Sequence, residues 1–312
     1  MKPKVYIDGQ EGTTGLQIYE RLGSREDITL LQIEPEKRKD PARRKELMNQ
    51  ADLVFLCLPD QAAIEAVTFL ENPNTRVIDA STAHRVAPGW VYGFPEWKKG
   101  QREQIQSARL LANPGCHATG FLSVTAPLVQ MGILPADYPV TAYSLTGYSG
   151  GGKKMIAQYE GADKEQALYA PRIYGLTLQH KHLPEMQKIA GLTYPPVFTP
   201  IVDDYYKGMA TVLMLQNFRL PGKPTTEEIC SRMAEYYQGE SMIQVLPFGT
   251  NESLLAANAL AGKDNLQITV SGNGDQTILT ARFDNLGKGA SGAAVQNMNL
   301  MLGFPETRGL NL

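Results

Sequence analysis

The chain has 312 residues, of which 43% are hydrophobic and 20% charged, and its net charge is −2. This composition is that of an ordinary globular protein, and the length favours two domains. The near-neutral charge and the lack of a long apolar segment argue against nucleic acid or a membrane as a partner. Three widely spaced cysteines, Cys57, Cys116 and Cys230, fit neither a disulfide framework nor a zinc pattern. We therefore expect free thiols, no metal and a cytoplasmic location.

Short apolar runs alternate with helical patterns through the first 115 residues. The runs are KVYIDG, ITLLQI, DLVFLCLP, RVIDAS and RLLAN, separated by segments such as TGLQIYERLGS and DQAAIEAVTFLEN. Strands of this length between helices are typical of a doubly wound, Rossmann-type parallel sheet, which binds its ligand at the carboxyl ends of the strands. We expect residues 1–116 to form an α/β domain that binds a dinucleotide.

The pattern changes from about residue 118. ATGFLSVTAPLVQMGIL predicts a helix that bends at Pro127 and stops at Gly132. Later runs such as VTAYSLTGYSG, FTPIVDD, GMATVLMLQNF, LQITVSGNG and QTILTARFDN are rich in β-branched and aromatic residues, which predicts a mixed or antiparallel sheet. Residues 117–285 are thus expected to form an α+β domain for catalysis and dimerisation. The final helix, in GASGAAVQNMNLMLGF, should return to the first domain, which residues 286–312 complete.

A glycine-rich turn, DGQEGTTG, follows the first strand and opens the first helix. Gly9, Gly12 and Gly15 would let backbone N–H groups approach a pyrophosphate at the helix N-terminus, with Thr13 and Thr14 beside them. The spacing differs from the commoner G-x-G-x-x-G, and a plain strand-to-helix turn is the alternative. In this context the turn predicts a dinucleotide site.

Two features bear on which dinucleotide binds. Glu34 ends the second strand, nineteen residues after Gly15, where an acid binds the ribose hydroxyls of NAD. Directly after it, PEKRKDPARRK carries a cationic cluster that suits the 2′-phosphate of NADP, namely Lys37, Arg38, Lys39, Arg43 and Arg44. A solvated helix face is the alternative for these cations. We favour NADP over NAD as the cofactor.

Cys116 follows a Pro-Gly turn in NPGCHATG, where a strand passes into a helix. A helix N-terminus can lower the pKa of a thiol because it stabilises the thiolate, the form that attacks carbonyl and acyl carbons. Cys57 within an apolar strand and Cys230 in a helical pattern better fit the alternative of a buried, inert thiol. The position of Cys116 therefore predicts a nucleophile.

Four histidines are available to exchange a proton with such a thiol: His84, His117, His180 and His182. His180 and His182 lie at i and i+2 in LQHKHLPEM, the spacing that places two side chains on one face of a strand. A metal ion would need further ligands, and Glu185 is the one nearby candidate. A general base is the favoured role, and a structural pair is the alternative.

Two further stretches are candidates for binding an anionic substrate. In DASTAHRV, Ser81 and Arg85 follow the fourth strand, where the doubly wound fold binds its ligand, and a cation with nearby hydroxyls suits phosphate or carboxylate. In GYSGGGKK, Ser149 and Lys153 flank glycines that can form a backbone nest for an anion. A helix cap with an exposed arginine and a flexible surface loop are the respective alternatives.

Taken in chain order, seven motifs resemble the N-acetyl-γ-glutamyl-phosphate reductases of the shorter subtype, within the aspartate-semialdehyde dehydrogenase-like family. They are DGQEGTTG, DASTAHR, YGFPE, NPGCHATG, GYSGGGKK, HKHLPEM and DNLGKGASG. The resemblance implies an NADPH-dependent oxidoreductase of arginine biosynthesis. Such an enzyme reduces N-acetyl-γ-glutamyl phosphate to the 5-semialdehyde through a thioacyl-cysteine and releases inorganic phosphate. The resemblance also implies a homodimer or homotetramer.

By this resemblance Cys116 is the nucleophile and His180 the general acid/base, with His182 beside it. Asn285, in DNLGKGA, would hold the nicotinamide carboxamide, and Tyr174 would orient His180. Three alternatives stay open: aspartate-semialdehyde dehydrogenase, a non-redox Cys–His acyl-transfer enzyme, and a nucleotide sensor without turnover.

Overall fold

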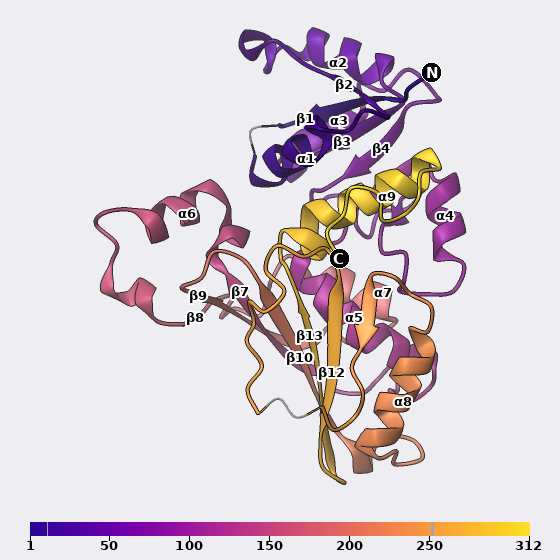
Figure 1. The fold of residues 1–312 in the computed structure, drawn as a ribbon, viewed down its shortest axis with the longest axis vertical. Helices are drawn as coiled ribbons and strands as arrows, with labels where there is room; N and C mark the ends of the chain where they lie inside the picture. The colour runs from indigo at the N-terminus through magenta and orange to yellow at the C-terminus, as the bar shows by residue number, and fades with distance from the viewer. Residues whose placement is uncertain (11, 251–252) are drawn as a thin grey trace. The chain divides into compact units, whose positions relative to one another are not determined.

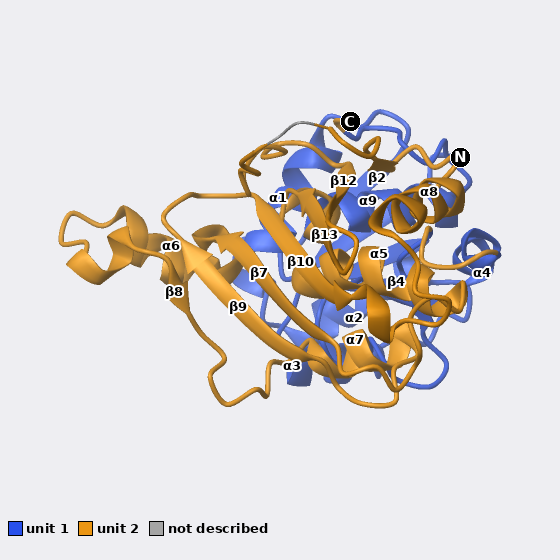
Figure 2. Ribbon diagram, turned by 90° about the horizontal axis from the view of Figure 1, so that it is seen from below, with its two compact units in different colours: residues 1–95, 100–114, 290–310 blue, residues 96–99, 115–289, 311–312 orange. Residues whose placement is uncertain are grey.

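The computed structural model describes residues 1–10, 12–250 and 253–312. The chain divides into two compact units (Figure 2). Residues 1–95, 100–114 and 290–310 form the first unit, and residues 96–99, 115–289 and 311–312 form the second. Each unit has its own β-sheet. In the described ranges, no helix has both the length and the apolar character needed to cross a membrane.

The first unit is built on a parallel sheet with the strand order β2-β1-β3-β4-β6-β5 (Figure 1). Its strands are β1 (Lys4–Asp8), β2 (Thr29–Leu31), β3 (Leu53–Leu56), β4 (Arg76–Asp79), β5 (Val91–Tyr92) and β6 (Leu110–Ala112). Its α-helices are α1 (Thr13–Gly23), α2 (Pro41–Gln50), α3 (Asp60–Val67), α4 (Gln101–Ser107) and α9 (Gly292–Leu302). The predicted Rossmann-type sheet is confirmed.

Helices cover both faces of this sheet because the side chains of a buried strand alternate between the faces. In β1, Val5 and Ile7 belong to one buried cluster, which includes Met298 of α9. Tyr6, between them, belongs to another cluster, with Met48 of α2. The final helix therefore completes the core of the first unit, as predicted.

The second unit contains a mixed sheet with the strand order β11-β12-β13-β10-β7-β9-β8. Its strands are β7 (Thr141–Gly147), β8 (Arg172–Ile173), β9 (Val197–Asp203), β10 (Met209–Gln216), β11 (Ile243–Val245), β12 (Leu266–Gly272) and β13 (Gln276–Phe283). Its α-helices are α5 (Cys116–Gln130), α6 (Gly152–Glu160), α7 (Leu183–Ala190) and α8 (Thr226–Tyr236). α5 packs against β10 and β13, and α8 against β12. The predicted α+β architecture is confirmed.

Helix α5 carries the candidate nucleophile at its first position and is buried over residues 117–128. It continues through Pro127 and ends before Gly132, whose φ of 69° is left-handed. A Cβ at Gly120 would lie 2.2 Å from the Thr211 hydroxyl oxygen, so only glycine lets α5 approach β10 this closely. Because α5 is buried against the sheet, the position of its N-terminal residue, Cys116, is fixed relative to the sheet.

Candidate active site

The glycine turn joins β1 to α1 in the first unit. Gly9 has a left-handed φ of +87°, and a Cβ there would lie 2.4 Å from the carbonyl oxygen of Cys57. A Cβ at Gly15 would lie 2.4 Å from the carbonyl oxygen of Gly9. Gly12 is the N-cap residue of α1, which Thr13 and Thr14 begin. The turn brings β1, β3 and α1 closer than side chains would permit, as a dinucleotide site requires.

A cavity of about 400 Å³ opens beside this turn, and its lining includes three cations, Arg38, Lys39 and Arg44. Arg44 is held by Asp8, with Nη2 2.8 Å from Oδ2. The first turn of α1 carries no acidic residue, so its backbone N–H groups can face an anion without like-charge repulsion. The glycines, the N-terminus of α1 and the cations together form surroundings that suit a phosphorylated dinucleotide.

Glu34 takes a different position from the one its sequence spacing indicates. β2 ends three residues before it, and Arg43 of α2 binds its carboxylate in a fork, with both N···O distances 3.0 Å. The hydrogen bond from Arg43 lowers the pKa of this carboxyl group. Glu34 is not among the residues that line the cavity.

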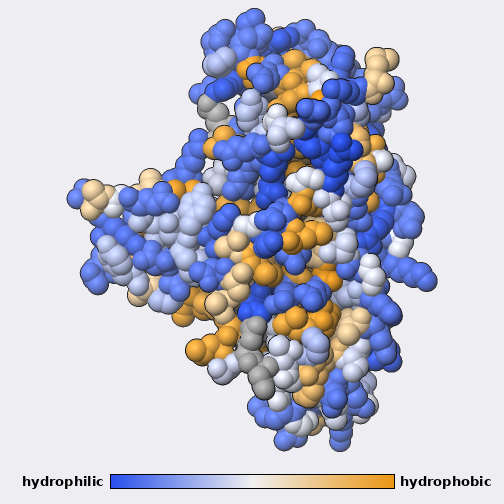
Figure 3. All heavy atoms as spheres, viewed as in Figure 1, coloured by the Kyte–Doolittle hydropathy of each residue, from blue (hydrophilic) through white to orange (hydrophobic). Residues whose placement is uncertain are grey.

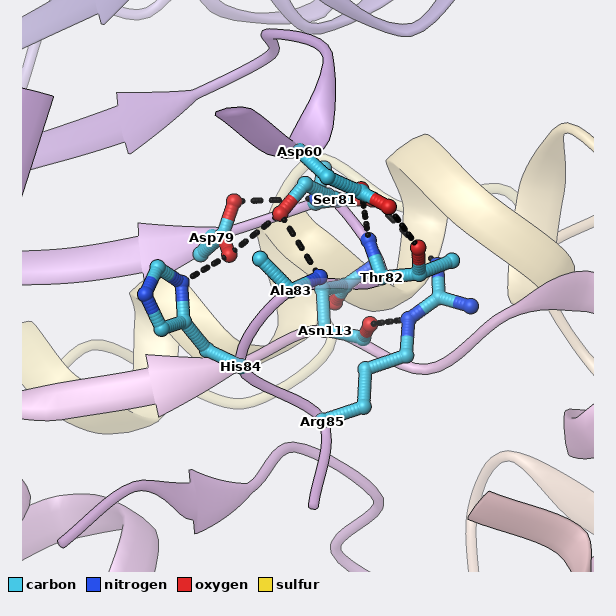
Figure 4. Close-up of polar contacts among 9 residues, drawn as sticks. Asp60, Asp79, Ser81, Thr82, Ala83, His84, Arg85 and Asn113 are labelled. Atoms are coloured by element: carbon cyan, nitrogen blue, oxygen red, sulfur yellow. Dashed lines mark hydrogen bonds and ion pairs between the residues drawn. The ribbon is translucent and has the colours of Figure 1, made fainter. Parts of the chain in front are cut away.

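The residues that follow β4 form a polar network in the first unit (Figure 4). Ser81 Oγ donates to Oδ2 of Asp79 at 2.6 Å, and Nδ1 of His84 lies 2.6 Å from the same oxygen. The guanidinium of Arg85 donates from Nε to the carbonyl oxygen of Asn113 at 3.1 Å. Arg85 is 9% exposed, so the alternative of an exposed arginine is wrong. The binding of substrate by Ser81 and Arg85 stays a prediction.

Cys116 is the first residue of α5, directly after the N-cap residue Gly115. The backbone N–H of Gly115 donates to Oε2 of the buried Glu185 at 3.2 Å. Glu185, which the sequence offers as a possible metal ligand, therefore holds the turn before the cysteine. In the part of the chain that the structure describes, no three His, Cys, Asp or Glu side chains form a metal-ligating group.

The three cysteines differ in their surroundings. Burial, with smaller contributions from Asp79 and Asp8, raises the pKa of the Cys57 thiol. Burial also raises the pKa of Cys230, which lies on α8. Both therefore remain thiols at neutral pH, whereas Cys116 is part-exposed at a helix N-terminus.

Three histidines gather in the second unit. The ring centroid of His117 lies 5.2 Å from that of His180 and 5.7 Å from that of His182, and the latter two are 4.7 Å apart. The expected strand face is wrong: His180 lies in a turn and His182 is the N-cap residue of α7. Pro184 in the first turn of α7 accounts for this, because proline favours a helix start.

The backbone N–H of His182 donates to Nδ1 of His180 at 3.2 Å. This bond places the proton of the neutral His180 ring on Nε2. Cys116, Tyr174 and His180 are part-exposed, whereas His117 and His182 are buried. The part-exposed groups are those that a substrate can reach.

Tyr174 hydrogen-bonds to His117 and lies beside His180. Its hydroxyl oxygen is 2.7 Å from Nε2 of His117, while its ring centroid is 6.1 Å from that of His180. Burial, and then the charges of His180 and Lys181, lower the pKa of His117 to about 3. Burial, and then the charge of Cys116, raise the pKa of Tyr174. His117 is thus neutral and Tyr174 protonated at working pH, and the sequence alone assigns no role to His117.

Asn285 and Ser149, predicted to bind different ligands, are joined directly. Nδ2 of Asn285 donates to Oγ of Ser149 at 3.0 Å, and its Oδ1 accepts from the backbone N–H of Gly208 at 2.8 Å. The second amide hydrogen of Asn285 can serve a ligand. Lys153 lies exposed on α6.

The chain after Asn285 winds as a π-helix over Gly287–Ser291. A Cβ at Gly289 would lie 3.0 Å from the Cβ of Cys116. Lys288, next to it, forms a fully buried ion pair with Glu96, with Nζ 2.7 Å from Oε1. The π-helix thereby packs against the cysteine and is fixed by a buried charge pair.

Two family profiles cover most of the sequence. "Semialdehyde dehydrogenase, NAD binding domain" matches residues 5–108, and "Semialdehyde dehydrogenase, dimerisation domain" matches residues 116–285. The chain belongs to the semialdehyde dehydrogenase family. Its fold is similar to aspartate semialdehyde dehydrogenase II from Vibrio cholerae, with a TM-score of 0.73 and 16% identity over 97% of this chain and 99% of that one. The Francisella tularensis enzyme gives a TM-score of 0.70 and 14% identity, over 95% and 99%.

Curated relatives narrow the comparison to one kind of reductase. The chain is 49% identical to N-acetyl-gamma-glutamyl-phosphate reductase 2 of Nostoc sp., over 99% of each chain. It is 48% identical to N-acetyl-gamma-glutamyl-phosphate reductase 2 of Pseudomonas putida, over 98% of this chain and 99% of the relative. The Brucella ovis reductase is also 48% identical, over 97% and 100%. The resemblance drawn from the motifs is confirmed.

Proposed function

We propose that this protein reduces N-acetyl-γ-glutamyl phosphate to N-acetylglutamate 5-semialdehyde in arginine biosynthesis, with NADPH as the reductant and release of inorganic phosphate. One observation carries the proposal. A part-exposed cysteine begins a buried helix, in the same unit as the part-exposed His180 and Tyr174. Relatives at about 48% identity carry the name of this reductase.

Cys116 is the nucleophile in this proposal. The N-terminus of α5 favours its thiolate, because the partial positive charge of the unpaired N–H groups lies next to the sulfur. The sulfur attacks the acyl carbon, the bond from that carbon to the phosphate oxygen breaks, and phosphate leaves with the electron pair. The resulting thioester divides one difficult displacement and reduction into two easier steps.

His180 acts on the carbonyl oxygen of the reacting group. Its Nε2–H donates to the oxyanion that forms on the acyl carbon, and the backbone N–H of His182 at Nδ1 keeps the ring in that tautomer. When bound, a reduced nicotinamide dinucleotide would supply the hydride for reduction of the thioester. Cleavage of the bond between carbon and sulfur then releases the aldehyde and restores the Cys116 thiolate.

The charges of the first unit favour NADP over NAD. Arg43 neutralises Glu34, the residue that would otherwise bind ribose hydroxyls, whereas Arg38 and Lys39 line the cavity. A guanidinium suits the 2′-phosphate because it can bind phosphate oxygens in a fork. The residues that would hold the rest of the dinucleotide are Gly9, Gly12, Thr13, Thr14, Gly15 and Asn285.

Candidate substrate contacts are proposed within each unit by itself. Ser81 and Arg85 supply a hydroxyl and a buried cation for the phosphate or carboxylate. Ser149, at the glycine-rich 3₁₀ turn after β7, and Lys153, on α6, are the candidates in the second unit.

We further propose a cytoplasmic homodimer or homotetramer. The exposed face of the second sheet carries the apolar side chains of Val197, Met214 and Ile278, and Figure 3 shows hydrophobic side chains over the strands β10, β12 and β13. One of the matching family profiles is described as a dimerisation domain. All three cysteines are free, which suits a reducing compartment.

A phosphate-dependent oxidation assay tests the proposed function. N-acetylglutamate semialdehyde and aspartate semialdehyde are each supplied with phosphate and with either NADP or NAD, and reduced nicotinamide is measured by absorbance. We expect turnover with N-acetylglutamate semialdehyde and NADP. Because one methylene is worth only about 1–3 kcal/mol of discrimination, both aldehydes must be compared quantitatively. Faster turnover of aspartate semialdehyde, or none of either, would refute the proposal.

A further inference from the structure

We propose that a buried hydrogen-bond chain from Thr211 through Ser144 and His117 to Tyr174 has a fixed direction. This direction makes the Tyr174 hydroxyl a hydrogen-bond donor to the oxyanion that forms on the substrate. The inference rests on the proposed function and deepens it. Tyr174 is then a catalytic residue, and His117 is a positioning residue that acts through it.

The hydrogen-bond chain joins three elements of the second unit and the segment that follows β8. Oγ1 of Thr211 in β10 lies 3.0 Å from Oγ of Ser144 in β7. That oxygen lies 3.0 Å from Nδ1 of His117 in α5, whose Nε2 lies 2.7 Å from the hydroxyl of Tyr174, just after β8. Each link is within hydrogen-bond distance. The chain therefore connects the buried sheet to the part-exposed end of Tyr174.

The number of donor hydrogens in these four side chains decides in which direction the hydrogen bonds run. A neutral imidazole donates from one nitrogen and accepts at the other, so the chain must run one way or the other. If Tyr174 donated to His117, the last proton would lie on Thr211. Among the residues the structure describes, the Thr211 hydroxyl has Ser144 as its one hydrogen-bond partner, and the residue is fully buried. That direction would leave a buried donor without an acceptor, which is costly.

The opposite direction satisfies every donor in the interior. Thr211 donates to Ser144, Ser144 donates to Nδ1 of His117, and Nε2–H of His117 donates to the oxygen of Tyr174. The Tyr174 proton then points away from His117. A buried His117 with a pKa near 3 stays neutral and keeps one donor and one acceptor, as this chain needs.

The Tyr174 end of the hydrogen-bond chain lies beside His180. Tyr174 and His180 are in ring contact, with centroids 6.1 Å apart. Burial, and then the charge of Cys116, raise the pKa of Tyr174, so the phenol keeps its proton. A protonated phenol whose O–H is turned away from His117 is suited to stabilise a developing oxyanion.

Kinetics of four variants test the chain in the assay for N-acetylglutamate semialdehyde. Tyr174→Phe should lower kcat by about 100-fold with little change in KM, the effect of one oxyanion donor. His117→Leu should lower kcat by about fivefold, because it removes the ring that turns the Tyr174 hydroxyl toward the substrate. Thr211→Val should leave kcat within about twofold, because Ser144 then becomes the terminal donor and still donates to Nδ1 of His117. The matched control is Thr125→Val, which removes a buried hydroxyl without a partner among the described residues and should leave kcat unchanged.

A double-mutant cycle separates an effect on kcat through the Tyr174 hydroxyl from an effect through packing. In the Tyr174→Phe background, His117→Leu should change kcat by less than about twofold, because the hydroxyl that His117 orients is already absent. An equal fivefold loss in both backgrounds would overturn the inference. Retention of kcat by Tyr174→Phe would overturn it as well.

A second measurement needs no turnover. In a long-range ¹H–¹⁵N spectrum of the histidine-labelled protein, assigned with His117→Gln, the inference predicts that His117 carries its proton on Nε2. Thr211→Val should leave that proton on Nε2, because Ser144 still donates to Nδ1. A proton on Nδ1 of His117 in the wild-type protein would overturn the proposed direction of the hydrogen-bond chain. The absence of wild-type turnover, with the Nε2 proton in place, would instead refute the proposed function.

Discussion

Acidification should destabilise this protein in part through the buried imidazole of His117. The folded protein holds the pKa of His117 at about 3, below its ordinary value of 6.5. Between those two values the unfolded chain binds a proton that the folded protein does not. Stability therefore falls as the pH falls through 6.5, and continues to fall until about pH 3.

The size of the effect follows from the pKa difference. Each pH unit within this window costs about 1.4 kcal/mol of unfolding free energy. Between pH 7 and pH 5 the His117 contribution is thus about 2 kcal/mol, a large share of the stability of an ordinary domain. The side chain is only 3% exposed, so solvent screening reduces this contribution little.

The assay compares chemical denaturation of wild type and His117→Gln at pH 7 and pH 5. Glutamine does not titrate, and its amide can still donate to Tyr174. Acidic groups with lowered pKa values, such as Asp27 and Glu228, are common to both proteins and cancel in the comparison. The variant should lose about 2 kcal/mol less than wild type over this range. Equal losses would show that His117 titrates normally in the folded state and would refute the reasoning.

Three further variants test other parts of the structure. Arg38→Ala should weaken NADPH binding about tenfold and NADH binding little, because one charge-assisted contact to the 2′-phosphate is lost; calorimetry showing equal losses would contradict the NADP assignment. Lys288→Met leaves Glu96 buried without its cation and should lower the free energy of unfolding by about 3–5 kcal/mol. A denaturation midpoint equal to that of wild type would show that the pair is not buried in solution. Gly9→Ala should abolish dinucleotide binding, because the residue has a left-handed φ and its Cβ would meet a carbonyl oxygen at 2.4 Å. Gly23→Ala, where a Cβ meets nothing within 4 Å, is the matched control and should bind normally.

The features that the sequence predicts well are those set by neighbouring residues. The glycine turn, the strands of the first sheet and the position of Cys116 after Pro-Gly each depend on a few consecutive residues, and the structure places them as expected. Helix α2 carries few apolar residues in PARRKELMNQ, so hydrophobic periodicity does not indicate it. That helix nevertheless supplies Arg43, which changes the interpretation of Glu34.

The features that the sequence cannot predict depend on distant partners. Lys288 and Glu96 are 192 residues apart, and the sequence around each residue does not indicate that the other is its partner. His117 stands beside the predicted nucleophile, yet its partners Ser144 and Tyr174 come from a strand and a turn further along the chain. Only tertiary packing brings these groups together and makes His117 neutral.

Detection of an acyl group on Cys116 tests the central claim most directly. The protein is mixed with N-acetyl-γ-glutamyl phosphate without nicotinamide cofactor, quenched in acid, and analysed by peptide mass spectrometry. We expect one N-acetylglutamyl group, labile to hydroxylamine, on the peptide that contains Cys116, and none on Cys116→Ala. An unmodified Cys116, or acylation of another residue in its place, would exclude Cys116 as the nucleophile.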